Sequence, residues 1–209
     1  MDVFECLKRL TQTKDFKKKK VNDKLIGVML YMATQVISAG DVQEWQFIVV
    51  RDEEKKKRLY EAALKQRWVK EADLDIVVCA DLEKVGLKYG KRGEILYAVE
   101  DVSFATLAIA LSATALGLGT YVVQAFDEDS VKMTLSLPDN LRPIFIIAVG
   151  YPAKEPEKKK RIMFDNLTWV DDYGRKYEIS YYVQPGVTKE PIPLSEILKG
   201  IAKRIKRKH

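Results

Sequence analysis

The chain has 209 residues, which is enough for one compact unit at about 150 residues per domain. Apolar residues make up 47% of it, and its 32% of charged residues exceeds the ~25% typical of proteins and argues against a disordered or fibrous chain. The one histidine is His209, which excludes catalytic triads and zinc sites that need an internal imidazole. If the protein is an enzyme, we expect a bound cofactor to carry its chemistry.

The first half of the chain predicts three helices and two strands. Apolar residues at helical spacing predict a helix from Asp2 to about Leu10, and Asn22 or Asp23 can cap a second helix. The segment WQFIVVRD predicts a strand, and Asp52 begins a charged helix. The uninterrupted apolar run LDIVVCA predicts a strand in the centre of a sheet. The apolar residues expected to point inward are Leu25, Val28, Met29, Met32, Ala33 and Val36 in the second helix and Leu59, Ala62, Ala63 and Leu64 in the third.

The second half predicts a further helix pair and two strands. The glycines of DLEKVGLKYGKRG suggest a mobile connection, followed by a long helix over residues 94–116. A strand over Thr120–Phe126, a short helix beginning at Asp127 and the strand RPIFIIAVG complete this part. Four strands among four or five helices, without strict alternation, predict an α+β fold.

The uncharged stretch Val102–Phe126 is long enough for a transmembrane helix. It contains several Ser and Thr residues, breaks at Gly117 and Gly119, and then becomes β-branched, so we interpret it as a buried core helix and expect no membrane span. The start MDVFECLKRL lacks the pattern of a secretory signal, and Cys6 and Cys79 form no CxxC pair. We therefore expect a reduced, cytoplasmic protein.

The net charge of +6 lies entirely in the last part of the chain. Residues 151–209 contain 14 Lys and Arg against 8 Asp and Glu, whereas residues 1–150 contain 22 of each kind. Such a basic tail can bind nucleic acid or a membrane, but a solvated surface without a dedicated partner is commoner. Abundant Lys, Arg and Glu with little Asn also resemble the composition of thermophile proteins.

We expect residues 1–150 to form the core and residues 151–209 to form an extension that is not an independent domain. Gly150-Tyr151-Pro152 ends the regular core, and the extension contains a basic loop, the extended segment KYEISYYVQP and a basic amphipathic helix from Ser195. Extended segments without a local partner commonly join the sheet of another subunit, which predicts an intertwined homodimer. The alternative is that the extension wraps its own subunit.

The common phosphate-binding loops do not occur in the sequence. It has no GxxxxGK[ST], and GLGTYVV lacks the third glycine of GxGxxG and runs from helix to strand. Taken in order, however, GDVQEWQFIVV, ALGLGT and AVGYP, followed by KKKR, resemble the nitroreductase family of flavoproteins over about residues 1–165. The resemblance implies an α+β homodimer with a mainly antiparallel sheet and FMN at the subunit interface. It also implies that NAD(P)H reduces nitroaromatic, quinone or similar electron-poor acceptors.

The same resemblance implies a set of flavin-binding residues, with no catalytic side chain because the flavin N5 carries the chemistry. Leu10 replaces the family's usual arginine, and Arg9 is the neighbouring cation that could substitute for it. Asp41 stands where the family has asparagine, and a carboxylate can accept hydrogen bonds but cannot donate them. The implied flavin-binding residues are Gln12, Lys14, Ser38, Asp41, Gln43, Gly117, Leu118, Gly119, Lys159 and Arg161.

Two other kinds of function remain open from the sequence. The departures at Leu10, Gln12, Ile37 and Asp41 also fit a flavin- or ligand-binding module without redox activity. The helix SEILKGIAKRIKRKH, with six basic residues between Lys199 and Lys208, could bind nucleic acid or an anionic surface, although its apolar stripe is equally explained by docking to the protein. An FMN-dependent oxidoreductase explains more of the motifs than either alternative.

Overall fold

The computed structural model describes residues 1–155, 161–162 and 164–176. Lys159, most of the extended segment KYEISYYVQP and the basic helix expected from Ser195 lie outside the described residues. The chain divides into two compact units, one containing Met1 and Cys6–Lys158 and the other containing Asp2–Glu5 and the residues from Lys159 onward. Each unit is described by itself.

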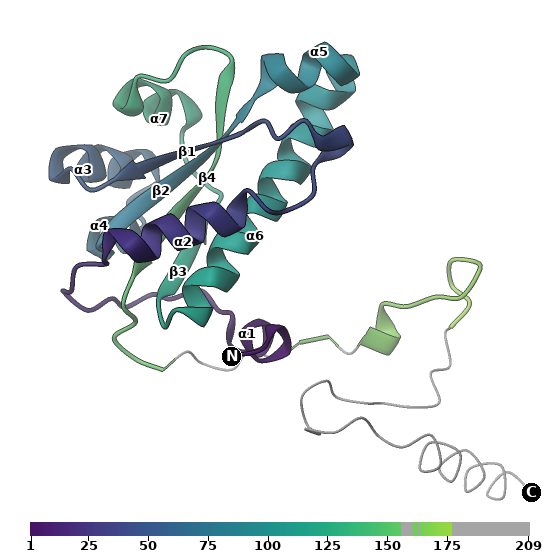
Figure 1. Ribbon diagram of the computed structural model, residues 1–209, viewed down its shortest axis with the longest axis horizontal. Helices are drawn as coiled ribbons and strands as arrows, with labels where there is room; N and C mark the ends of the chain where they lie inside the picture. Colours follow the sequence, from purple (N-terminus) through teal and green to yellow (C-terminus); the bar gives the residue numbers. More distant parts are fainter. Residues whose placement is uncertain (156–160, 163, 177–209) are drawn as a thin grey trace, which may run out of the picture. The chain divides into compact units, whose positions relative to one another are not determined.

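The first unit is built on a four-stranded sheet in the order β1-β2-β4-β3 (Figure 1). The strands are β1 Trp45–Val50, β2 Leu74–Asp81, β3 Gly119–Val123 and β4 Leu141–Gly150, and every neighbouring pair is antiparallel. The two central strands are β2 and β4, and β2 is buried from Leu74 to Ala80. The predictions of an α+β fold with an antiparallel sheet, and of LDIVVCA as a central strand, are confirmed.

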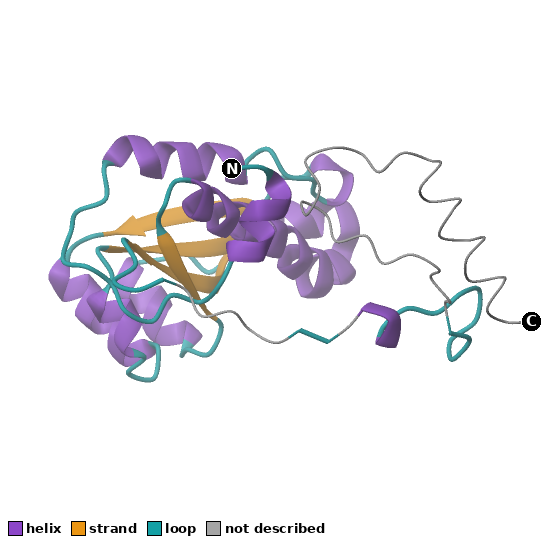
Figure 2. Ribbon diagram, turned by 90° about the horizontal axis from the view of Figure 1, so that it is seen from below, coloured by secondary structure: helices purple, strands orange, loops and turns teal. Residues whose placement is uncertain are grey.

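Helices cover both faces of this sheet (Figure 2). Helices α2 Asp23–Ala33 and α6 Ala98–Ala115 pack beside each other on one face, and α3 Glu53–Ala62, α4 Arg67–Glu71 and α7 Glu128–Leu135 cover the other. Successive side chains of β2 point to opposite faces of the sheet, so this strand contributes to the core on both sides. Ile76 and Val78 pack on the side of α2 and α6, and Val77 and Cys79 pack on the side of α3, α4 and α7. The remaining helix at the start of the chain is α1 Val3–Arg9.

Side-chain caps fix the first turns of three helices where the sequence predicts them. Asn22 accepts a hydrogen bond from the Lys24 N–H, Asp52 from the Lys55 N–H and Asp127 from the Ser130 N–H, at 2.9, 2.9 and 2.7 Å. Each cap satisfies one of the backbone donors that a helix leaves unpaired in its first turn. The starts of α2, α3 and α7 are therefore confirmed.

The segment expected to be a mobile connection is helical. Asp81 accepts the Lys84 N–H at 3.1 Å and caps α5 Leu82–Arg92. Gly90, with φ 57° and ψ −149°, supplies the one non-helical residue inside it, and a π-helical turn, Gly93–Tyr97, joins α5 to α6. Gly90 therefore permits a sharp change in helix direction, and it does not disorder the segment.

Two predicted inward faces are partly wrong. Leu64 has 68% of its surface exposed because its backbone turns left-handed, with φ 54°, immediately after α3 ends. In α2 the buried residues are Ile26, Met29 and Ala33, whereas Val28 and Met32 are exposed. The buried face of α2 is thus rotated relative to the predicted face, and apolar side chains remain on the outer surface of the helix.

One helix of the described residues, Leu82–Ala115, is long and apolar enough to span a membrane by length and composition. The core helix of a globular protein passes the same test, and α6 buries residues such as Val102, Ala105 and Ile109 against the sheet. The strand that follows, β3, is shorter than predicted and ends at Val123.

The second unit contains the 3-10 turn Phe164–Asn166 and a small antiparallel bridge between Trp169 and Lys176. The rings of Trp169 and Tyr173 pack edge to face with centroids 5.3 Å apart.

Candidate functional site

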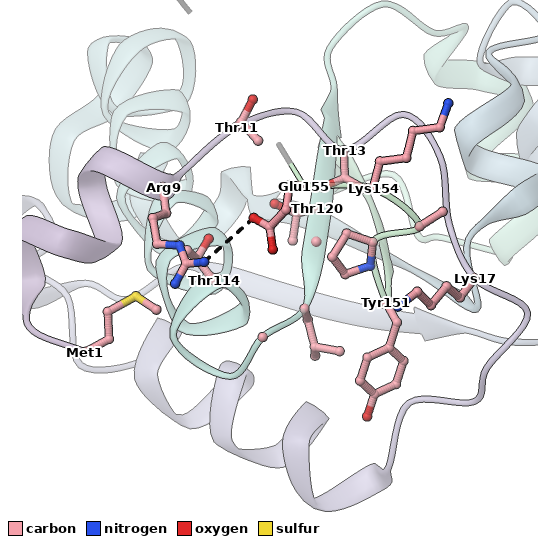
Figure 3. Close-up of a pocket in the computed structure, with 15 residues that line it drawn as sticks. Met1, Arg9, Thr11, Thr13, Lys17, Thr114, Thr120, Tyr151, Lys154 and Glu155 are labelled. Atoms are coloured by element: carbon pink, nitrogen blue, oxygen red, sulfur yellow. Dashed lines mark ion pairs between the residues drawn. The ribbon is translucent and has the colours of Figure 1, made fainter. Parts of the chain in front are cut away.

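A cavity of about 400 Å³ opens in the first unit where three segments meet (Figure 3). The segments are the loop after α1, the turn between α6 and β3, and the chain that follows β4. The lining residues are Met1, Arg9, Thr11, Thr13, Lys17, Thr114, Gly117, Leu118, Gly119, Thr120, Tyr151, Pro152, Ala153, Lys154 and Glu155.

Backbone hydrogen bonds fix the loop after α1 along the edge of the sheet. Gln12 forms a parallel bridge with Thr120, the Thr13 N–H donates to the Thr120 carbonyl at 2.8 Å, and the Gln12 side chain accepts the Val122 N–H at 2.8 Å. Further along, the Lys17 N–H donates to the Tyr151 carbonyl at 2.8 Å. The loop is therefore a rigid wall of the cavity, held by β3 on one side and by the chain after β4 on the other.

The turn between α6 and β3 brings bare backbone to the cavity. Gly117 has φ 74°, which favours glycine, and a Cβ built there would meet no described heavy atom within 4 Å. At Gly119 a Cβ would instead collide with the Thr13 hydroxyl. Gly119 thus lets the loop after α1 approach β3, and Gly117 leaves open space beside the turn.

Cations outnumber anions around the cavity. Arg9, Lys17 and Lys154 line it, against the single carboxylate of Glu155. The Arg9 guanidinium lies 3.8 Å from the Glu155 carboxylate, and both side chains are well exposed, so this ion pair is weak (Figure 3). A positively charged wall of this kind favours an anionic ligand group.

Asp15, on the same loop, is paired mainly with a cation that does not line the cavity. Arg67 donates to its carboxylate at 2.7 Å, and this hydrogen bond holds the pKa of Asp15 below its ordinary value. Lys154 adds a second cation 3.7 Å from the other oxygen. Asp15 therefore offsets Lys154 only in part and leaves the charges of Arg9 and Lys17 in the lining unpaired with it.

Of the predicted flavin-binding residues, those of the loop after α1, of the Gly117–Gly119 turn and of the basic motif after β4 are placed unequally around this cavity. Gly117, Leu118 and Gly119 line it. The Gln12 side chain is used to hold the loop to β3, and Lys14 is exposed and is not one of the lining residues. Arg161 is an exposed residue of the second unit, and Lys159 lies outside the described residues.

Ser38, Asp41 and Gln43 share one loop that lies elsewhere in the first unit. The Gln43 N–H donates to Ser38 Oγ at 3.1 Å, and the Gln43 side-chain amide donates to Asp41 at 2.8 Å. The loop is tied to the start of α6, since the Ala39 N–H donates to the Asp101 carboxylate at 2.8 Å.

The two groups of residues are far apart in one chain. Thr114, at the end of α6, lines the cavity, and at 1.5 Å per residue it lies roughly 20 Å along the helix from Asp101. The loop that contains Ser38, Asp41 and Gln43 therefore does not reach the cavity of its own chain.

Several lining residues do not follow from sequence reasoning. Thr11, Thr13 and Lys17 flank the predicted positions of the first loop, and Tyr151 and Lys154 follow the AVGYP segment. Their closeness in sequence to these motifs could have indicated a role in the site. Only the hydrogen bonds between distant segments, however, bring them together around one cavity. Arg9, considered as a substitute for the missing arginine, does line the cavity.

The residues that line this cavity include no Cys and no His. Burial raises the pKa of Cys79 to about 12, so its thiol is not a nucleophile at neutral pH. No group of three or more His, Cys, Asp or Glu side chains suited to a metal ion occurs in the part of the chain that the structure describes. The lining can bind and orient a ligand through backbone, hydroxyl groups and cations.

Comparisons with known proteins agree on one family. The sequence model of the nitroreductase family matches residues 8–91 and 63–151. A protein of Methanothermobacter thermautotrophicus, provisionally named NADH dehydrogenase/NAD(P)H nitroreductase, is 33% identical over 162 residues, covering 75% of this chain and 80% of that protein. The FMN reductase (NADPH) of Bacillus subtilis is 28% identical over 150 residues, which is 66% of this chain and 60% of that protein. The crystal structure of a nitroreductase family protein from Clostridium difficile 630 superposes with a TM-score of 0.73 at 30% identity, covering 82% of this chain and 99% of that one.

Proposed function

This chain belongs to the nitroreductase family of oxidoreductases, and we propose that it is an FMN-dependent enzyme that carries electrons from NAD(P)H to nitroaromatic, quinone or similar electron-poor acceptors. The observation that carries this proposal is the cavity where the Gly117–Gly119 turn meets a wall of cations. Its volume of about 400 Å³ lies within the range of small-molecule sites, roughly 300–1,000 Å³.

The residues around the cavity suit the two ends of FMN. The open space beside Gly117 allows a flat ring to approach the backbone, where N–H and C=O groups can bond its polar edge. The cations Arg9, Lys17 and Lys154 suit the phosphate, and the guanidinium of Arg9 can bond it through two N–H groups. Lys159 and Arg161 remain proposed as further phosphate ligands on the basis of the family motif.

FMN, when bound, would supply the two-electron chemistry by which NAD(P)H is oxidised and the acceptor reduced. The chain's own residues would then bind and orient the reactants and need supply no nucleophile. The single histidine, His209, and the raised pKa of Cys79 agree with this division of roles.

Asp41 replaces the family's asparagine without removing the polar contacts of its loop. Its carboxylate accepts one N–H of the Gln43 amide, which fixes the orientation of that amide. The second Gln43 N–H and the amide oxygen remain for the flavin. We infer that Gln43, oriented by Asp41, takes over the donor role of the missing asparagine.

We further propose that the site is completed in a homodimer. Because Ser38, Asp41 and Gln43 lie roughly 20 Å from their own cavity along α6, these residues can contact the same flavin only if a second copy supplies them. Exposed apolar side chains on α2 and α6 offer a surface for that copy. They are Val28, Tyr31, Met32, Phe104 and Leu107.

Residues 151–209 are proposed to extend the core and not to form an independent domain. Tyr151 and Lys154 line the cavity, so the start of this extension forms part of the site. Truncation after Tyr151 should therefore remove a wall of the cavity as well as the rest of the extension.

The test is the absorbance spectrum of the purified protein, the identity of any released flavin, and its stoichiometry per chain. We expect one FMN per chain, bound on purification or on addition, and anaerobic bleaching of the flavin by NADH or NADPH. Reoxidation by a quinone and by a nitroaromatic compound then tests the acceptor class. Titration with FMN that gives neither fluorescence quenching nor thermal stabilisation would overturn the proposal.

A further inference from the structure

Two carboxyl groups are buried beneath the loop that contains Ser38, Asp41 and Gln43. Glu44 directly follows this loop and has 0% of its surface exposed, and Asp101, in the first turn of α6, has 3% exposed. The two side chains interact with each other. Buried carboxylates are rare unless they are paired or hydrogen-bonded, so this pair needs a physical explanation.

The hydrogen bonds of the two groups indicate where the proton lies. The Asp101 carboxylate accepts the Ala39 N–H at 2.8 Å, so one of its oxygens already has a donor. Neither carboxyl oxygen of Glu44 accepts a hydrogen bond from another described residue. Because burial without a donor disfavours a charged carboxylate, Glu44 is the group suited to hold a proton, and its O–H can then donate to Asp101, so that the two carboxyls share one proton.

The charged groups around the pair come from α5 and β2. Burial and, after it, the neighbouring Asp101 together raise the pKa of Glu44 to about 7, against the opposing effects of a backbone hydrogen bond at Glu44 and of the Lys84 ammonium of α5. Lys84 also donates to the Gln43 carbonyl at 2.9 Å. The Asp81 N–H of β2 donates to the Glu44 carbonyl at 2.9 Å, while the Asp81 carboxylate accepts from the Lys84 N–H and from Asn140.

The loop above the pair is strained and depends on these attachments. Gly40, Asp41 and Gln43 have φ of 52°, 58° and 54°, and such left-handed backbone persists in non-glycine residues only where the surroundings hold it. The attachments are the Ala39 bond to Asp101, the Lys84 bond to Gln43 and a Lys88 bond to the Gly40 carbonyl at 2.5 Å. Loss of the attachment at Asp101 would free one end of the strained segment.

We propose that Glu44 and Asp101 are positioning residues that hold this loop in its flavin-binding conformation only while they share a proton. The proposal rests on the proposed function, in which the loop contacts the flavin of the partner subunit. When the shared proton leaves, two like charges remain in a buried site, and the repulsion is relieved by moving Glu44 toward solvent. Because Glu44 follows Gln43 directly, that movement displaces the flavin-binding residues.

The test measures FMN affinity of the full-length protein by fluorescence quenching between about pH 6 and about pH 8. The neutral fraction of a group titrating near pH 7 falls about tenfold over this range, so the Kd of the wild type should rise about tenfold. Glu44→Gln, whose amide can still donate to Asp101, should bind FMN with little change across the range. The ratio of the two Kd values cancels the ionisation of the FMN phosphate itself.

Two further variants separate charge from packing. Glu100→Gln, an exposed neighbour of Asp101 on α6, is the matched control and should keep the wild-type pH dependence. Asp101→Asn removes the like charge while its amide oxygen can still accept the Ala39 N–H and its amide N–H can donate to Glu44, so the loss of FMN affinity between about pH 6 and about pH 8 should largely disappear. If Glu44→Gln fails to fold, Asp101→Asn still decides, because an unchanged tenfold loss of affinity in that variant would overturn the inference.

An NMR titration of the protein without flavin provides a second readout. The carboxyl carbon of Glu44 and the amide of Ala39 should titrate together near pH 7. Equal pH dependence of FMN affinity in wild type and Glu44→Gln would overturn the inference, as would a Glu44 carboxyl that titrates at the ordinary pH of an exposed glutamate. Failure of every variant to bind FMN at any pH would instead overturn the proposed function, and the NMR titration would still decide the state of the pair.

Discussion

Replacing Arg9 by alanine should weaken FMN binding and leave riboflavin binding nearly unchanged. The Arg9 guanidinium lines the cavity, and its pair with Glu155 at 3.8 Å is exposed and therefore weak, so it can turn to a phosphate. A hydrogen bond to a charged group contributes about 1.5–3 kcal/mol, which corresponds to a roughly 10- to 100-fold rise in Kd. Fluorescence titration with FMN and with riboflavin, which lacks the phosphate, measures the difference.

Two matched variants sharpen this experiment. Glu155→Gln removes the anion that competes for Arg9 and should strengthen FMN binding slightly, by less than about 1 kcal/mol. Arg58→Ala changes an arginine of α3 that does not line this cavity and should affect neither ligand. An unchanged preference for FMN over riboflavin in Arg9→Ala would refute the reasoning. A loss confined to Arg161→Ala would then assign the phosphate to the basic motif after β4.

Three further changes test the wall, the buried pair and a helix cap. Gly119→Ala should abolish FMN binding and lower the free energy of unfolding by about 1–3 kcal/mol, because its Cβ collides with Thr13. Gly117→Ala is strained only by its φ of 74° and should lower the free energy of unfolding by about 1 kcal/mol. Equal FMN binding by both variants would contradict this. The pKa of Glu44 is raised from 4.5 to about 7 in the folded state, so the native protein holds this proton more tightly than the unfolded chain between those values. Titration of Glu44 should therefore lower the free energy of unfolding, measured with urea, by on the order of 2 kcal/mol from about pH 4.5 to pH 7. This contribution to the pH dependence of stability should vanish in Glu44→Gln. Asp127→Ala should lower the free energy of unfolding by about 1 kcal/mol through loss of the α7 cap, while Asp127→Asn retains most of it and neither changes FMN affinity.

Local chemistry made much of this fold predictable from the sequence. Asn22, Asp52 and Asp127 each offer an oxygen to the free N–H groups of a first helical turn, and the helices begin there. The run LDIVVCA has too few polar groups to face water and becomes the central strand β2. Such signals depend only on near neighbours in the chain.

The errors arose where a residue type permits two structures. Glycines suggested a loose connection between residues 81 and 93, but Asp81 caps a helix there and Gly90 only redirects it. Leu64 is apolar and was therefore expected to point inward, yet the left-handed turn after α3 places its side chain on the surface. A single-residue change in backbone conformation decides both cases, and side-chain hydrophobicity does not report it.

The candidate site was predictable only in part because it depends on long-range contacts. The Gly117–Gly119 turn follows from the motif, since glycine is needed where backbone must approach closely. Lys17 and Lys154 belong to ordinary basic stretches, and only hydrogen bonds between distant segments bring them to one cavity. Glu44 has no local signal, because a buried glutamate and an exposed one look alike until Asp101 is placed beside it.

The way the loop after α1 is fastened to β3 also has a consequence for biosynthesis. The Gln12 side chain and the Val122 N–H that it accepts are separated by 110 residues in the chain. A nascent chain emerging from the ribosome must therefore keep its first segment unpaired until β3 appears, and the cavity cannot close until Tyr151 and Lys154 follow. The cavity thus cannot form until about three quarters of the chain has been translated, although its first wall is among the first parts to be made.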